Sequence, residues 1–94
     1  MVHSNTPLAN PMIVLREESD NWALLFNPDT SDIIVINPVG VTVWKMLDGK
    51  NRYDEILENL RDSFSEVPDS AMHDIEAFVG DLEMQGFVGF VVDN

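Results

Sequence analysis

The sequence predicts an α+β domain of winged-helix type, in which an N-terminal three-stranded antiparallel β-meander is followed by three α-helices. Three observations carry this prediction. Short apolar runs separated by turn residues fill residues 12–36. The last of these runs leads directly into Asn37 and Pro38, which is typical of a capped helix start. Beyond that point apolar residues recur at helical spacing as far as residue 85.

The strands are predicted from apolar runs and the polar segments between them. Residues 12–16 are apolar up to Arg16, residues 22–26 are apolar throughout, and the polar turn at residues 18–21 between them is typical of a hairpin. A second turn at residues 27–31 precedes the third expected strand, residues 32–36, which contains the β-branched run 33–36. Because both connections are short, we expect the three segments to pair as an antiparallel meander.

The helices are expected at residues 39–47, 53–64 and 70–85, where the apolar period is about 3.6. Gly49 can adopt the left-handed conformation that ends the first helix. Pro68 lies in the turn before the third helix. The residues expected in the core share inward positions in these periods: Ile13 or Val14, Trp22, Leu24, Ile34, Ile36, Val41, Trp44, Leu47, Ile56, Leu60, Phe64, Ile75, Phe78 and Leu82.

The two ends of the chain are expected to differ from the middle. Residues 1–11 are rich in polar residues and proline, so we interpret them as a flexible N-terminal arm preceding a single domain at residues 12–94. The apolar tail at residues 87–92 is interpreted either as a short strand or as a segment that pairs with another chain.

Charge excludes several classes of partner. The chain carries 17 acidic and 5 basic residues, for a formal net charge of −12, and no Lys or Arg follows Arg61. Nucleic acids and anionic membranes are bound through Lys and Arg, so neither is an expected partner. The acidic residues are interpreted as a solvated surface that keeps a small protein in solution, or as a surface that steers a basic partner.

Other features suggest a cytoplasmic protein. The absence of cysteine excludes disulfides and thiolate chemistry and agrees with a reducing compartment. We see no secretory signal and no apolar run long enough to span a membrane, so a soluble cytoplasmic domain is expected.

The sequence gives little support for catalysis. His3 lies in the expected arm, and His73 has only nearby carboxylates, which do not complete a metal site. There is no glycine-flanked nucleophile turn and no glycine-rich phosphate loop. We therefore predict that the protein is not an enzyme and needs neither a cofactor nor a metal ion.

A set of residues in the centre of the chain resembles the PqqD-like family, whose small domains are also called RiPP recognition elements. The resemblance begins with Ile36, Asn37, Gly40, Trp44, Leu47, Asp48 and Gly49, where Ile36 replaces the more common leucine. It continues through the third predicted helix with Asp74, Ile75, Phe78, Val79, Leu82 and Gly86.

The resemblance implies a function in peptide capture. In proteins of this family, the leader of a ribosomally made precursor peptide adds as an antiparallel strand to the third strand, in the groove beside the third helix. The peptide is then presented to a maturation enzyme, often a radical S-adenosylmethionine enzyme. Carried onto this sequence, the expected peptide-binding residues are Ile33, Ile34, Val35, His73, Asp74, Ala77, Phe78 and Asp81. If Ile34 and Ile36 point into the core, Ile33 and Val35 point outward.

Two alternatives come from other functional classes. One is a structural or assembly module, for example a homodimer joined through the apolar tail. The other is a winged-helix nucleic-acid binder, which the fold allows but the acidic third helix argues against.

Overall fold

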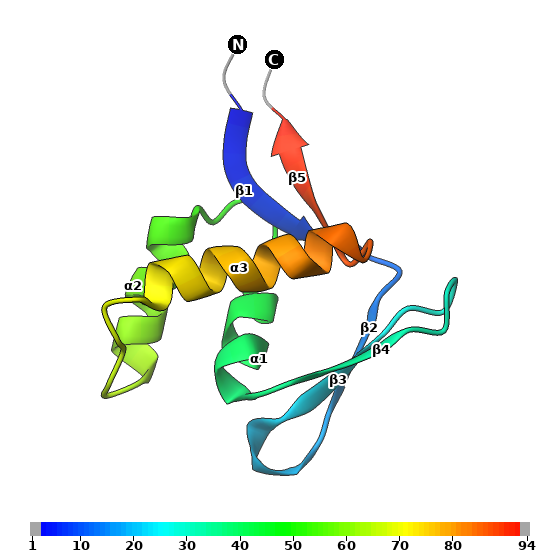
Figure 1. Cartoon of the computed structure of the whole chain (residues 1–94), viewed down its shortest axis with the longest axis horizontal. Coiled ribbons are helices and arrows are strands. Elements are labelled where there is room, and N and C mark those ends of the chain that lie inside the picture. The colour runs from blue at the N-terminus through cyan, green and yellow to red at the C-terminus, as the bar shows by residue number, and fades with distance from the viewer. Residues whose placement is uncertain (1–2, 93–94) are drawn as a thin grey trace.

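The computed structural model of the protein describes residues 3–92 and confirms the predicted α+β, winged-helix-like class (Figure 1). A three-stranded sheet is followed by three helices, and an additional strand lies at each end of the chain. In chain order the elements are β1 (His3–Ala9), β2 (Val14–Glu17), the 3₁₀ turn η1 (Ser19–Asn21), β3 (Ala23–Phe26), β4 (Ile33–Ile36), α1 (Pro38–Lys45), α2 (Tyr53–Ser63), α3 (Ala71–Met84) and β5 (Val88–Val92).

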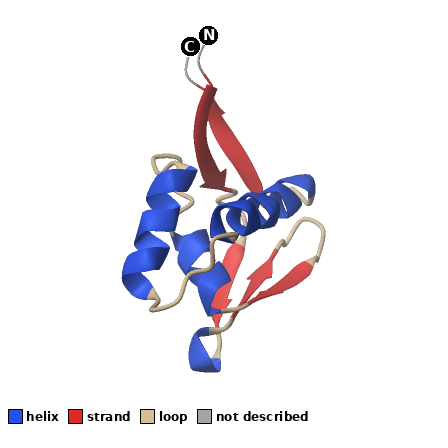
Figure 2. Ribbon diagram, turned by 60° about the vertical axis from the view of Figure 1, so that its left-hand side comes forward, coloured by secondary structure: helices blue, strands red, loops and turns tan. Residues whose placement is uncertain are grey.

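The predicted meander is the antiparallel sheet β2-β3-β4, with β3 in the centre. Leu25 lies opposite Leu15 on one side and Ile34 on the other. β1 and β5 form a separate two-stranded ribbon, which projects away from the helices and from the larger sheet (Figure 2). Since β3 is central, β2 and β4 are the two edges of the larger sheet.

The inward face of β3 differs from the prediction. Ala23 and Leu25 are fully buried, whereas Trp22, expected in the core, is 46% exposed and Leu24 lies on the outer face beside Val35. Ala23, Leu24, Leu25 and Phe26 are all apolar, so alternation of polarity could not show which residues face inward.

The first predicted strand left a choice between two residues, and the structure resolves it. Ile13 packs against the core, whereas Val14 is 53% exposed. On the helices and β4 the prediction was better, and the core residues confirmed as buried are Ile36, Val41, Trp44, Leu47, Ile56, Leu60, Ile75 and Leu82. Ile34, Phe64 and Phe78 are partly buried and pack against that core.

The start of α1 is formed as the sequence indicates. The Asn37 side chain accepts a hydrogen bond from the Gly40 N–H at 2.8 Å, and Pro38 occupies the first turn. A Cβ placed on Gly40 would lie 3.1 Å from the Ile36 Cβ and 3.4 Å from the Phe78 Cζ. Glycine therefore lets α3 and the end of β4 approach α1 closely.

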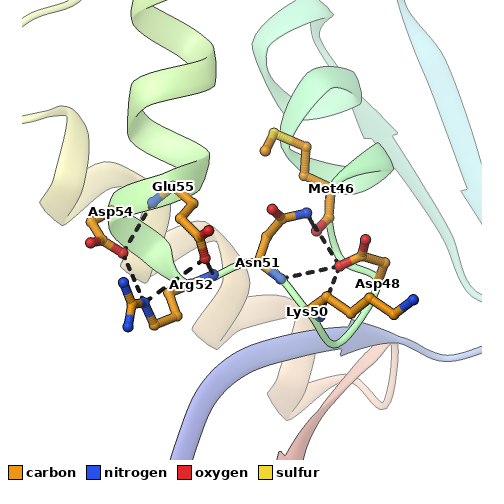
Figure 3. Close-up of polar contacts among 7 residues, drawn as sticks. All are labelled: Met46, Asp48, Lys50, Asn51, Arg52, Asp54 and Glu55. Carbon is orange, nitrogen blue, oxygen red and sulfur yellow. Dashed lines mark hydrogen bonds and ion pairs between the residues drawn. The ribbon is translucent and has the colours of Figure 1, made fainter.

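The turn between α1 and α2 is held by Asp48 (Figure 3). One Asp48 carboxylate oxygen accepts hydrogen bonds from the backbone N–H groups of Lys50 at 2.9 Å and Asn51 at 3.2 Å. Gly49 has φ of 79°, a conformation that favours glycine. At the start of α2, the Glu55 carboxylate accepts from the Arg52 N–H at 2.8 Å.

This turn also holds β1, so the segment predicted as a flexible arm contains a strand. The Ala9 N–H donates to the Leu47 carbonyl at 2.8 Å, and the Gly49 N–H donates to the Pro7 carbonyl at 3.0 Å. The proline-containing, polar sequence gave no alternation from which a strand could be predicted. Its pairing comes from β5, nearly the whole chain away.

The apolar tail forms β5, one of the two predicted outcomes. It pairs with β1 of its own chain, with Ala9 opposite Val88. Residues 1–2 of the expected arm and residues 93–94 lie outside the described part of the chain. No helix within residues 3–92 has the length and apolar character needed to cross a membrane.

Candidate functional site: an apolar groove beside a free strand edge

A groove of about 480 Å³ opens between the end of β4, the first turns of α1 and α3, and the segment joining α2 to α3. Its volume lies in the range typical of ligand pockets, roughly 300–1,000 Å³. Most of its lining side chains are apolar: Val35, Ile36, Val39, Val43, Leu60, Phe64, Val67, Pro68, Ala71, Ile75 and Phe78. The remaining lining residues are Asn37, Gly40, Glu66 and Asp74.

The edge strand β4 presents unpaired backbone groups next to this groove. The Asn27 N–H donates to the Asp32 carbonyl at 2.9 Å, so the backbone groups of Asp32 point toward the β3 side of the β3–β4 ladder. In an antiparallel ladder every second residue bonds to the same neighbour, so the backbone groups of Ile34 and Ile36 also face β3. The N–H and C=O groups of Ile33 and Val35 therefore point away from β3, toward the free edge.

The other ladder gives the same alternation independently. The Glu18 N–H donates to the Trp22 carbonyl at 2.7 Å, which directs the Trp22 and Leu24 backbone groups toward β2. Leu24 lies opposite Val35, so it does not bond across the β3–β4 ladder. Within residues 3–92, β4 pairs with no strand except β3. Two donors and two acceptors, from Ile33 and Val35, are thus available at this edge.

The side chains of β4 alternate as predicted. Ile33 and Val35 are 60% and 61% exposed, whereas Ile34 is partly buried and Ile36 is buried. Of the three strand residues nominated for peptide binding, only Val35 lines the groove, while Ile33 contributes its backbone edge and Ile34 faces the core. These exposed β-branched side chains form an apolar strip along the edge.

The third helix brings two of its five nominated residues to the groove, Asp74 and Phe78. Asp81 is exposed, and at seven residues beyond Asp74 it lies on the same stripe of the helix, farther from the groove. Ala77 and His73 are also exposed, and the helical period turns them progressively toward solvent. His73 lies nearly opposite the buried stripe that contains Ile75 and Val79.

The sequence interpretation missed the end of the groove formed by α1, α2 and the segment after α2. Val39 on α1 and Val67 in the connecting segment belong to it, together with Leu60, Phe64 and Pro68. A signal was present, because Val39 and Val67 are apolar residues outside the buried helical periods. Val39 remains 42% exposed, which marks an apolar surface not used by the core.

The charged side chains lining the groove are both acidic, Glu66 and Asp74. The Asp74 carboxylate accepts a hydrogen bond from the Ser70 hydroxyl at 3.2 Å. Among the described residues, the ion pairs formed by Arg16, Lys45, Arg52 and Arg61 all involve other acids. The groove therefore combines an apolar floor with an anionic rim.

Two ionisable groups with shifted pKa values lie outside the groove. The Lys50 backbone N–H lowers the pKa of Asp48, an effect partly opposed by desolvation and reinforced by the Asn51 N–H. Burial raises the pKa of Tyr53, and the charges of Glu76 and Glu83 add to this shift. Since Glu76 and Glu83 act on a residue of α2, they mark the side of α3 that faces away from Asp74.

No cluster of three or more metal-ligating side chains occurs in the described part of the chain. The chemistry that the groove offers is apolar burial, charge at its rim, and main-chain hydrogen bonds at the edge of β4.

Two solved structures resemble this one over nearly the whole of both chains. One is TbiB1 in complex with the TbiA(beta) leader peptide, with a TM-score of 0.74, 19% identity, and coverage of 92% of this chain and 99% of that chain. The other is a lasso peptide synthetase B1 complexed with the leader peptide, also with a TM-score of 0.74 and 19% identity, covering 89% and 98% of the two chains. At this identity the similarity establishes the fold. No curated protein matches the chain.

The sequence itself matches the family model of coenzyme PQQ synthesis protein D, PqqD, over residues 23–88. This range runs from the start of β3 to the start of β5 and includes the groove. The match confirms the resemblance seen in the motif residues. Because this is a family of non-catalytic peptide-binding domains, it also confirms the prediction that the chain is not an enzyme. The chain belongs to the PqqD family.

Proposed function

We propose that this chain captures the leader segment of a ribosomally synthesised precursor peptide by β-strand addition to the free edge of β4, and presents it to a maturation enzyme. The observation that carries the proposal is that the backbone N–H and C=O groups of Ile33 and Val35 face the free edge of β4, directly beside an apolar groove. Strand addition gains affinity from main-chain hydrogen bonds, and the neighbouring groove selects side chains.

The comparisons support the proposal in two ways. The chain belongs to the PqqD family, and both solved structures of the same fold are complexes with leader peptides. We propose that the maturation enzyme is a radical S-adenosylmethionine enzyme, as the family resemblance implies. We further propose that the leader is captured and presented in the cytoplasm. A ribosomally made precursor is available there.

The test is a calorimetric titration of the protein with the leader of a precursor encoded beside it, repeated with Val35→Pro. Proline removes the Val35 N–H, which faces the free edge, so the β3–β4 ladder is kept. One net hydrogen bond contributes about 0.5–1.5 kcal/mol, and the proline ring also obstructs the approaching strand. We therefore expect the affinity to fall about tenfold or more.

The matched control is Glu17→Pro on the opposite edge of the sheet. By the ladder alternation, the Glu17 N–H also points away from β3, and its side chain loses only an exposed ion pair with Lys45. Both variants are checked for unchanged folding by circular dichroism. Equal leader affinity for the two proline variants would contradict binding at β4, and no binding by the folded parent would refute capture of that peptide.

A second function, as an assembly module, is favoured by one specific observation. Apart from Arg16 on β2, the outer face of the β2-β3-β4 sheet is apolar, and Val14, Trp22, Ile33 and Val35 on or beside it are about half exposed. Exposed sheet faces are more often polar, so this face is a candidate interface between copies of the chain. Sedimentation of the parent and of Val14→Lys, both without peptide, tests this interface. A dimer formed through this face should dissociate in the Val14→Lys variant, whereas a dimer formed elsewhere should not.

A further inference from the structure

We infer that the bound peptide is read in a fixed register, as a strand whose apolar anchor lies opposite Ile36 and is preceded by a basic residue. This inference rests on the proposed function and names the class of leader that the groove accepts. It follows from the hydrogen-bonding alternation of β4, the position of the groove along that strand, and the charge of its rim.

The alternation fixes which peptide residues bond and which point inward. The sheet is antiparallel throughout, and antiparallel pairing is slightly the more stable per residue. In an added antiparallel strand, the residues opposite Val35 and Ile33 form the main-chain hydrogen bonds, and their side chains join the exposed outer face. The residues opposite Ile36 and Ile34 turn their side chains toward the inner face.

The groove selects one of the two inward positions. Ile36 lines the groove and Ile34 does not, so the peptide residue opposite Ile36 is the anchor. For comparison, an apolar cavity of about 150 Å³ holds a benzene ring. At about 480 Å³, the groove can take a large aromatic or aliphatic side chain together with part of its neighbour.

The rim adds a charge requirement. A peptide antiparallel to β4 continues from its anchor in the N-terminal direction past the end of β4, and we place this part of the peptide beside Glu66 and Asp74, which line the same groove as Ile36. Among residues 3–92, no Lys or Arg lines the groove, and a carboxylate beside an apolar floor attracts a cation more strongly than one in open water. The recognised segment is therefore basic on the N-terminal side of its anchor, and an acidic residue there is rejected.

The first test selects binders from a displayed library of random peptides, each about twelve residues long, since a strand of about five or six residues must fit with flanks. The expected consensus has Lys or Arg within the three residues before a large apolar residue. Acidic or uncharged binders in place of this pattern would overturn the inference and leave strand addition intact. If no peptide binds the folded protein at β4, the proposed function itself fails.

The second test measures one selected peptide against charge variants. Asp74→Asn combined with Glu66→Gln is expected to weaken binding about threefold to tenfold, and the loss should disappear when the basic residue of the peptide is replaced by Thr. The control, Glu76→Gln combined with Glu83→Gln, also removes two carboxylates, on the α2-facing side of α3, and should change the affinity less than twofold. Asp74 also lies in the first turn of α3, so the thermal midpoint of each variant separates an effect on the helix from an effect on binding.

The third test reads the register from the peptide backbone. Methylation of a backbone nitrogen removes its hydrogen-bond donor. We expect binding to be lost when the first or third residue after the anchor is methylated, because these lie opposite Val35 and Ile33. Methylation of the second residue after the anchor, opposite Ile34, should be tolerated. The reverse pattern, or no alternation, would overturn the register.

Discussion

Gly40 and Gly80 are both helical, yet the same substitution by alanine should change the stability of the protein in opposite directions. Alanine in place of glycine within a helix gains about 0.5–1 kcal/mol. At Gly80, on α3, no heavy atom apart from the adjacent residues and the backbone of the helix itself lies within 4 Å of the added Cβ, so this gain should appear in full. For a domain of this size it corresponds to a rise in Tm of about 2–8 °C.

At Gly40 the same gain is opposed by a close contact. The added Cβ would lie 3.1 Å from the Ile36 Cβ, which belongs to a buried residue at the end of β4, and 3.4 Å from the Phe78 Cζ. Overpacking of this kind typically costs about 1–3 kcal/mol. The Gly40→Ala protein should therefore be less stable than the parent by roughly 0–2.5 kcal/mol, and less stable than Gly80→Ala by about 1–3 kcal/mol.

Urea and thermal unfolding, followed by circular dichroism, measure both variants in parallel. Gly40→Ala should also weaken peptide binding, because Ile36, which lines the groove, must shift to make room for the added Cβ, whereas Gly80→Ala should leave the affinity unchanged. If Gly40→Ala stabilised the protein as much as Gly80→Ala, the close approach of α1, β4 and α3 would be refuted.

The remaining predictions concern the orientation of β3 and the response to alkali. Leu25→Ala should destabilise the protein by about 2–5 kcal/mol and by more than Trp22→Ala, because Leu25 is fully buried and Trp22 is half exposed. Unfolding in urea measures both variants, and the opposite order of stability would contradict the assignment of Leu25 to the inner face of β3. The raised pKa of Tyr53 means that the folded state keeps the phenol proton at a pH where the unfolded state loses it. The stability that the neutral Tyr53 phenol gives to the folded state is complete below the ordinary pKa of about 10, and it is lost as the pH rises through the raised pKa. Unfolding measured from pH 9 to 12 should therefore show a smaller loss of stability for Tyr53→Phe than for the parent, and equal slopes would exclude this origin.

Most of the helical half of the fold could be predicted because its signals are local. Asn37 caps α1 as expected, and the 3.6-residue period identified Ile56 and Leu82 as buried. Gly49 has the expected positive φ but does not end α1, which stops at Lys45 with Met46 as its C-cap, so Gly49 belongs to the turn that follows. These features depend on residues close together in the sequence, where side-chain chemistry alone decides the conformation.

The errors arose where long-range pairing decides the structure. The strand β1 is held by β5 and by the turn at Gly49, so its own polar, proline-containing sequence does not predict a strand. β3 is apolar on both faces, and only its register with β2 and β4 shows that Leu25 points inward. The acidic rim also depends on the chain path, because the bend between α2 and α3 brings Glu66 and Asp74 to the lining of the same groove.

The pairing of β1 with β5 determines how the domain can be connected to other proteins. His3 lies opposite Val92, so the described chain enters and leaves through one end of the ribbon, away from the helices (Figure 1). A domain whose ends meet can be inserted into a surface loop of a host protein while its fold is kept. Here such an insertion would hold the domain by a two-stranded stalk and leave both β4 and the groove uncovered. A maturation enzyme engineered to carry it in this way would hold its own leader-capture site at a high local concentration.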